Sequence, residues 1–399
     1  MRRYAFRIGT ALFTFFIGVT LATAWVFSSR IDGIKPVDIS TSPVPNGNQT
    51  LEMVFVLDTT SSMTGLIDGA KQKIWGIVND VMQSPSHPSV RVGLVGYRDR
   101  GDEYVTTILP LTNDLDKVYT TLMNYQAAGG GDAPEDVRRA LVDGVRKINW
   151  SQSGSNVAQI MFLVGDAPPH NDYRDEPDTS STTAEAARKG IIVNSIQCGN
   201  MPGTREVWEE IARVGQGQYF SIAQDGGVQA ITTPYDEQLG QLATQLGGTF
   251  VAYGGGAGES GDKKRALVAR EVASVEASVA TSAPSTAKAE RALNKALNGE
   301  AYVGDLLQNI ENGSIKLDAV KDEDLPSDLR KLSVEERKQE IEKRLAERRD
   351  LRAQIMSLSK QRQEFIAAEA QKRSGGKQRG FDAAVSDALK EQLARKRIK

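Results

Sequence analysis

Residues 51–63 read LEMVFVLDTTSSM, an apolar run that ends in a carboxylate and continues into hydroxyl side chains. A buried strand delivers its last residue to the carboxyl edge of a sheet, where α/β proteins bind ligands. Asp58 with the hydroxyls of Thr60 and Ser62 makes an all-oxygen cluster, which suits a hard cation such as Mg²⁺. The alternative is an Asp that closes a strand before residues that cap the next helix. Later stretches of the chain decide between these interpretations.

The composition of the 399-residue chain excludes several classes of site. The formal net charge of −2 gives no global attraction for nucleic acid, and we expect none as a partner. Cys198 is the single cysteine, which excludes an intramolecular disulfide and a zinc site built from cysteines. A hydrophobic content of 40% and a charged content of 25% are typical of soluble globular proteins.

Residues 1–30 carry the features of a membrane signal-anchor or a signal peptide. Three arginines among the first seven residues precede an uncharged stretch at 8–27, which is long enough to span a bilayer. The positive-inside rule keeps the arginines in the cytoplasm and exports the rest of the chain. Cleavage after Ala22-Thr23-Ala24 is the alternative, and the protein would then be secreted. Residues 31–49, rich in Pro, Gly, Ser and Thr, are predicted to be a linker.

Strand and helix patterns alternate from residue 51 to about residue 250. Apolar runs predict strands at 51–58, 90–97, 105–109, 158–164, 191–196 and 218–222, the third of which stops at Pro110. Apolar stripes at helical spacing predict helices at 66–81, 114–125, 134–148, 182–189, 205–214 and 235–246. Crossovers of this length allow parallel pairing, so the expected fold is α/β with a doubly wound, mostly parallel sheet.

Two further loops carry groups that fit a cation site beside Asp58. A Gly-rich loop at 129–131 continues into Asp132, and the strand at 158–164 ends in Gly165-Asp166. Together with Asp58-x-Thr60-x-Ser62 on this alternation, the loops resemble a von Willebrand factor type A domain, a Rossmann-like fold, over residues 50–253.

The resemblance implies a divalent cation at a metal-ion-dependent adhesion site. In such a site Thr60 and Ser62 would bind the metal directly. Asp58 and Asp166 would act mainly through bound waters or as hydroxyl acceptors. Asp132 stands where the family has a Thr. The expected cation is Mg²⁺, with Mn²⁺ or Ca²⁺ as alternatives, and the expected function is binding of an unidentified protein partner without enzymatic activity.

Asp132 changes the expected charge of the site. Three aspartates carry −3 against the +2 of the metal, which strengthens cation binding and weakens attraction for an acidic ligand. A structural metal, or a neutral or basic partner, then becomes more plausible than adhesion to a carboxylate. The register of the Gly-rich loop also leaves Glu135 as an alternative neighbour of the metal.

Residues 97–103, 129–135 and 165–170 resemble one branch of this family, which includes the type A domain of atypical alpha-kinases and related bacterial proteins. This chain lacks the nucleotide loop of a kinase. A bacterial membrane-anchored protein, with its domain in the periplasm or at the cell surface, is therefore expected. A metal-dependent hydrolase that uses Asp58 or Asp166 is the alternative function.

The C-terminal third is predicted to be helical. Residues 254–262 form a Gly-rich linker, and 263–399 form a helical, partly coiled-coil-like extension that ends in a short amphipathic helix at 381–393. A long run at 334–373 has nearly heptad apolar spacing, which Arg348 and Arg362 interrupt. These helices could pack on themselves or on a partner, giving an oligomer. A solvated charged helix is the alternative.

Overall fold

The computed structural model describes residues 49–84, 88–131, 133–225, 227, 230–299, 304–373 and 381–396. The predicted membrane span at 8–27 lies outside these residues. Among the helices within the described ranges, none is long and apolar enough to cross a membrane.

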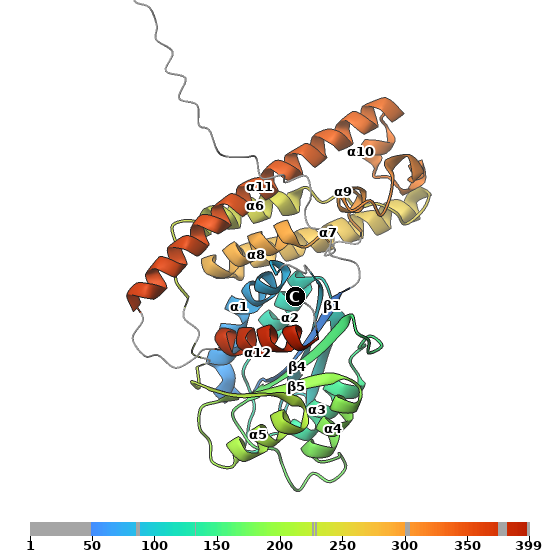
Figure 1. The fold of residues 1–399 in the computed structure, drawn as a ribbon. Coiled ribbons are helices and arrows are strands. Elements are labelled where there is room, and N and C mark those ends of the chain that lie inside the picture. Colours follow the sequence, from blue (N-terminus) through green and yellow to red (C-terminus); the bar gives the residue numbers. More distant parts are fainter. Residues whose placement is uncertain are drawn as a thin grey trace, which may run out of the picture. The chain divides into compact units, whose positions relative to one another are not determined.

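Six strands of the described chain form one sheet in the order β3-β2-β1-β4-β5-β6 (Figure 1). Neighbouring strands run parallel except β3, which is antiparallel to β2. The strands are β1 (Thr50–Asp58), β2 (Ser89–Tyr97), β3 (Thr106–Thr112), β4 (Val157–Gly165), β5 (Ile191–Cys198) and β6 (Gln216–Ile222). The predicted doubly wound, mostly parallel sheet is confirmed.

β1 lies in the middle of the sheet, and its residues from Leu51 to Asp58 are buried. Its alternate side chains enter two separate apolar layers: Phe55 and Leu57 pack in one, and Val54 and Val56 pack in the other. A strand covered on both faces needs an almost continuous apolar run, which explains the sequence of this stretch.

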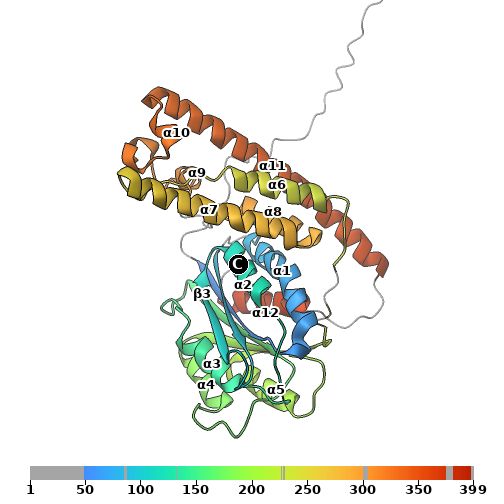
Figure 2. The ribbon, with the colours of Figure 1, turned by 180° about the vertical axis from the view of Figure 1, so that it is seen from behind.

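Helices cover both faces of the sheet (Figures 1 and 2). One face packs against α1 (Thr64–Met82), α2 (Leu115–Asn124) and α12 (Phe381–Arg395). The other packs against α3 (Val137–Arg146), α4 (Thr179–Arg188) and α5 (Thr204–Val214). The central strands β2, β1, β4 and β5 are thus largely shielded from water on both sides, whereas β6 at the edge is partly exposed.

Several element ends differ from the sequence prediction, and two of these differences have a local physical reason. β3 continues through Pro110, which is exposed, because an edge strand tolerates a residue without an N–H. α4 begins at Thr179 rather than at residue 182, since the Asp178 carboxylate accepts a bond of 2.6 Å from the backbone N of Ser181 and caps the helix earlier.

α12 packs on β5, β6 and α1, although it comes from the end of the chain. The ring of Phe381 lies 6.0 Å from that of Phe55 in β1. Gln392 is fully buried and exchanges two hydrogen bonds with the buried Asn194 of β5, at 3.1 and 2.5 Å. The sequence predicts this amphipathic helix but not its position on the sheet.

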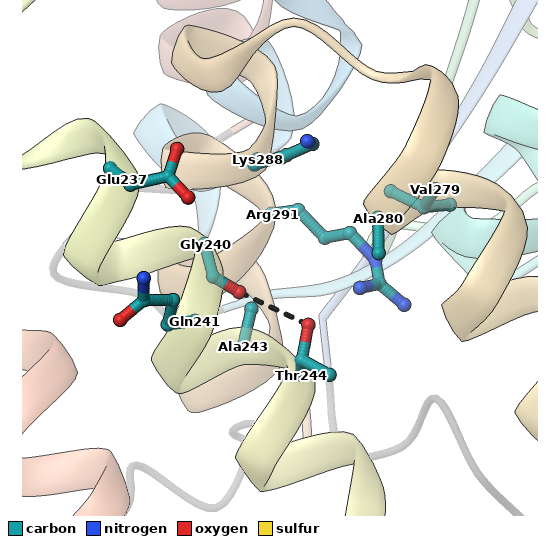
Figure 3. A pocket seen from close by; sticks show the side chains of 9 residues that line it. All are labelled: Glu237, Gly240, Gln241, Ala243, Thr244, Val279, Ala280, Lys288 and Arg291. Carbon is teal, nitrogen blue, oxygen red and sulfur yellow. Dashed lines mark hydrogen bonds between the residues drawn. The ribbon is translucent and has the colours of Figure 1, made fainter.

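The segment between β6 and α12 forms a second layer of helices, which we call the helical body. It contains α6 (Asp236–Gly248), α7 (Gly258–Ser282), α8 (Ser285–Leu297), α9 (Leu306–Glu311), α10 (Ser327–Arg330) and α11 (Val334–Arg373). α6 packs on α8 and α11 rather than on the sheet, and α7 begins inside the stretch predicted as a linker. A hollow of about 150 Å³ lies between α6, α7 and α8 (Figure 3).

α11 packs back on its own chain, and the two arginines that interrupt its apolar seam are buried. Arg348 donates to the Asp305 carboxylate at 2.7 Å, and Arg362 donates to Asp236 at 2.7 Å. Ile355 of the same helix is fully buried against α6 and α8. Both arginines therefore take part in the packing of the helix, and the alternative of a wholly solvated helix is wrong.

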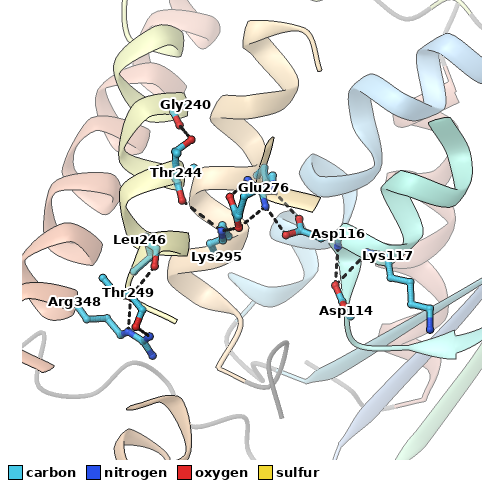
Figure 4. A network of polar contacts seen from close by, with 12 residues as sticks. Asp114, Asp116, Lys117, Gly240, Thr244, Leu246, Thr249, Glu276, Lys295 and Arg348 are labelled. Carbon is cyan, nitrogen blue, oxygen red and sulfur yellow. Dashed lines mark hydrogen bonds and ion pairs between the residues drawn. The ribbon is translucent and has the colours of Figure 1, made fainter. Parts of the chain in front are cut away.

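A buried ion-pair network joins the helical body to the sheet domain. Arg291 of α8 donates to Asp116 of α2 at 2.6 Å and to Glu276 of α7 at 2.9 Å. Lys295 pairs with Glu276, and Asp116, Glu276 and Lys295 lie together in Figure 4. Burial, followed by the charge of Arg291, lowers the pKa of Lys295 to about 8. The contact between the helical body and the sheet domain thus depends on buried ion pairs.

Replacing Arg291 with Met should therefore be strongly destabilising. Asp116 would lose its ion pair with Arg291 and Glu276 would keep only Lys295, so Arg291→Met is expected to lower the free energy of unfolding by about 3–5 kcal/mol. Urea denaturation measures it. The matched control is Arg205→Met, which breaks an exposed pair with Glu209 and should cost less than about 1 kcal/mol. Equal losses for the two variants would contradict the network's role.

Candidate metal centre

The first loop after β1 gathers one carboxylate and two hydroxyls. The backbone N and Oγ1 of Thr60 both donate to Oδ1 of Asp58, at 2.9 and 2.7 Å. Thr60 Oγ1 lies 3.3 Å from Oγ of Ser62. Asp58 is fully buried and Thr60 nearly so, whereas Ser62 is exposed. The hydroxyl of Thr60 thus lies between the buried carboxylate of Asp58 and the hydroxyl of the exposed Ser62.

Asp166, the residue after β4, lies at the same edge of the sheet. It is buried, and its Oδ2 accepts a hydrogen bond of 2.6 Å from Nε2 of Gln224. The same nitrogen donates to the backbone O of Ser62 at 3.3 Å. Gln224 follows β6 and links the two loops. Sequence reasoning missed it, and its position after a strand that ends at this edge is the only signal that could have found it.

A glycine at 165 allows the two aspartate-bearing strands to approach one another. A Cβ there would lie 3.2 Å from the Cβ of Asp58 and only 2.4 Å from the hydroxyl of Tyr97. Any larger residue would push these groups apart, so Gly165 belongs to the construction of the site.

The Gly-rich loop brings Glu135 to the cluster. Gly130, with φ of 79°, lies against Thr60 and Glu135, because a Cβ there would be 3.4 Å from Thr60 Cβ and from Glu135 Oε1. Glu135 N donates to the backbone O of Pro168 at 3.1 Å, which fixes it beside the loop of Asp166. Asp132 lies outside the described residues. Glu135, the alternative neighbour in the sequence interpretation, lies in this loop beside Gly130 and Thr60, and the position of Asp132 stays a prediction.

The loops are held together by contacts behind the site. Arg98 is buried and donates to the backbone O of Thr59 at 3.2 Å and to that of Gln126 at 2.6 Å. Asp102 accepts a bond of 3.1 Å from the N of Gly130. The first loop and the Gly-rich loop are thus tied to the end of β2.

Two carboxylates of the site have raised pKa values. Burial raises the pKa of Asp58 to about 7, against the bonds from Thr60 and with help from Asp166. Burial, and then the charge of Asp58, raises the pKa of Glu135 to about 9. Oδ2 of Asp58 and Oε2 of Glu135 are buried and have no hydrogen-bond partner within the described residues. Buried anionic oxygens of this kind require a cation or a proton.

These groups fit a divalent cation that keeps part of its water shell. Across the described ranges, no group of three or more His, Cys, Asp or Glu side chains converges closely enough to hold a metal alone. Hydroxyls and waters would have to complete the coordination, as Mg²⁺ prefers. His170 does not join the cluster, since its ring stacks on Tyr173 and contacts Asp99 and Asp172.

Comparison with known proteins agrees with this architecture. The family model of the von Willebrand factor A domain matches residues 52–234, which hold the three loops and all of the sheet except the first two residues of β1. This part of the chain is therefore similar to a von Willebrand factor A domain.

Two mammalian proteins share this region. The chain is 28% identical to von Willebrand factor A domain-containing protein 7 of Mus musculus over 193 residues, which are 48% of this chain and 20% of that protein. The Homo sapiens protein of the same name is 28% identical over 198 residues, 50% of this chain and 20% of that protein. The chain thus spans about a fifth of the length of these relatives.

Two solved structures resemble the same part of the chain. The conserved hypothetical protein BatB from Bacteroides thetaiotaomicron has 18% identity and a TM-score of 0.32, and the match covers 44% of this chain and 90% of that one. The pilus adhesin SpaC from Lactobacillus rhamnosus GG has 14% identity and a TM-score of 0.34, with 44% and 29% covered.

The raised pKa values give the metal-free protein a distinctive pH dependence. Asp58 and Glu135 have folded-state pKa values of about 7 and 9, above their ordinary values of 3.8 and 4.5. The folded state then binds more protons than the unfolded state in this window, so stability falls as pH rises. Each pH unit inside the window costs about 1.4 kcal/mol per affected carboxylate.

Urea denaturation in EDTA at pH 5.5 and pH 8.5 tests this expectation. The unfolding midpoint should be lower at pH 8.5, and the difference should shrink in Asp58→Asn, which cannot ionise. A midpoint that stays constant or rises toward pH 8.5 in the unsubstituted protein would show that folding does not raise the pKa values of these carboxylates.

Proposed function

We propose that the von Willebrand factor A domain of this chain binds a divalent cation and uses it to bind a protein partner. Mg²⁺ is the preferred ion, with Mn²⁺ or Ca²⁺ as alternatives. The observation that carries the proposal is the pair of buried, unpartnered oxygens of Asp58 and Glu135 beside two hydroxyls. A cation placed there would satisfy both oxygens.

Each residue of the site then has a distinct role. Thr60 and Ser62 supply neutral hydroxyl oxygens directly to the metal. Asp58 and Asp166 hold hydroxyls or metal-bound waters, and Glu135 adds a third carboxylate. Asp132 remains a sequence prediction. Neutral ligands nearest to the ion leave it electron-poor, so that an open position can take an oxygen from a partner.

The charge of the site favours a partner without a carboxylate at the contact. Asp58, Glu135 and Asp166 together carry up to −3 beside a +2 ion. An acidic group would meet net negative charge, whereas a carbonyl or hydroxyl oxygen near a basic group would be attracted. We therefore infer a neutral or basic epitope on the partner.

The residues outside the described ranges bear on where this binding would occur. The arginine-flanked apolar stretch at 8–27 supports an exported domain anchored at a membrane, in the periplasm or at the surface of a bacterium. Cleavage of that stretch would release the protein. Assembly of an oligomer through the helical body is a further part of the proposal.

A metal-dependent hydrolase is the second candidate, and the raised pKa values of Asp58 and Glu135 favour it, because such shifts gather at catalytic sites. A panel of phosphoesters with Mg²⁺ separates the two functions. Turnover that disappears in Asp58→Asn would establish the hydrolase, and no turnover above that of the variant supports the binding domain.

Loss of one hydroxyl should weaken the metal site selectively. Thr60→Ala is expected to lower the affinity for Mg²⁺ at least tenfold, about 1.4 kcal/mol, as measured by isothermal titration calorimetry. The matched control is Thr64→Ala, which removes a hydroxyl bonded only to the backbone O of Ser61. Unchanged affinity in Thr60→Ala, or the same loss in the control, would contradict the assigned role.

A further inference from the structure

A second cavity lies where the sheet domain meets the helical body. Its volume is about 410 Å³, and it is lined by α1, α8, α11 and α12. It lies away from the loops of the metal centre and shares no residue with them. Side chains of Ile77 and Ile366 give it an apolar wall, and five charged side chains line the remainder.

Four of the five charged side chains that line the cavity form two ion pairs. Lys73 of α1 pairs with Asp382 of α12 at 3.2 Å. Arg362 of α11 pairs with Glu290 of α8 at 2.5 Å. The fifth is Asp80 of α1, which has no ion pair or hydrogen bond within the described part of the chain. The cavity thus holds one surplus negative charge.

Asn79 fixes the wall of the cavity that α1 forms. It is only 1% exposed and lines the cavity. Its Nδ2 donates to the backbone O of Glu290 at 2.8 Å and to the carboxylate of that residue at 3.3 Å, which fixes the orientation of the amide. Its Oδ1 is buried and lacks a hydrogen-bond partner among the described residues. The amide of Asn79 therefore holds α1 against α8 beside Asp80.

The surroundings of Asp80 resemble those of a binding site. Water reaches its carboxylate, yet the packed helices around it raise its pKa to about 6. Burial is the main cause, and the charge of Glu290 is next. Lys390 and Lys73 oppose the shift, and Asp382 adds to it. A raised pKa in a concave site is a feature of binding sites, and a bound cation would favour the ionised form of Asp80.

We propose that this cavity binds an organic cation, a guanidinium or amine on a short apolar stem. Asp80, the charged residue of the lining that forms no ion pair within the described part of the chain, would take the positive charge. The stem would lie against Ile77 and Ile366. The cation could be a free small molecule or a basic side chain of a protein, and the two sources share this chemistry.

Calorimetric titration of the full chain in EDTA tests the proposal, since the chelator removes any contribution of the metal centre. Butylguanidinium and the neutral butylurea have the same shape and differ in charge. The charged probe should bind at least tenfold more tightly. A second titration uses a blocked Gly-Arg-Gly peptide. Tighter binding of butylguanidinium would point to a free small molecule, and tighter binding of the peptide would point to a basic side chain of a protein.

Two variants probe the site in different ways. Asp80→Asn removes the charge, and Ala367→Lys adds an ammonium to the cavity wall at an exposed position. Each should weaken cation binding at least tenfold, whereas Asp350→Asn on the exposed face of α11 should leave it unchanged. Equal affinity for butylurea, no binding of either cation, or undiminished binding in both cavity variants would overturn the proposal.

Discussion

The burial of carboxylates at the carboxyl edge of β1 and β4 is the constraint on which the rest of the domain depends. Two bonds from Thr60 satisfy one oxygen of Asp58 and leave the other without a partner. Among the described residues, Glu135 of the neighbouring loop also has a buried oxygen without a hydrogen-bond partner. Anions held in this way are costly unless a cation joins them. The apolar packing of the sheet therefore supports a site that a divalent cation would complete.

The scaffold of this site is built from distant parts of the chain. β1 and β4 lie side by side in the sheet, and α12, the last helix, covers β5 and β6 on the same face as α1. The helical body, which lies between β6 and α12 in the sequence, is held to α2 by the buried ion pair of Arg291 and Asp116. Because α1 begins immediately after the hydroxyl loop and packs on both α8 and α12, the geometry of the loop rests on contacts with both layers.

Local patterns in the sequence predicted much of this arrangement, and long-range contacts account for the rest. The apolar run into Asp58 and the hydroxyls at alternate positions predicted the first loop, because strand and loop there follow from neighbouring residues. Glu135 was only an alternative, since its place is decided by backbone pairing with Pro168. Arg362 looked like an interruption of an apolar seam, because its partner Asp236 lies far away in the sequence.

The most direct test of the central claim is anomalous diffraction from crystals of this protein soaked in Mn²⁺, a substitute for Mg²⁺ with a strong signal. The account predicts one dominant peak beside the hydroxyls of Thr60 and Ser62, within reach of the carboxylates of Asp58, Glu135 and Asp166 directly or through one water. A map without a peak at these side chains, with Mn²⁺ bound elsewhere or absent, would contradict it.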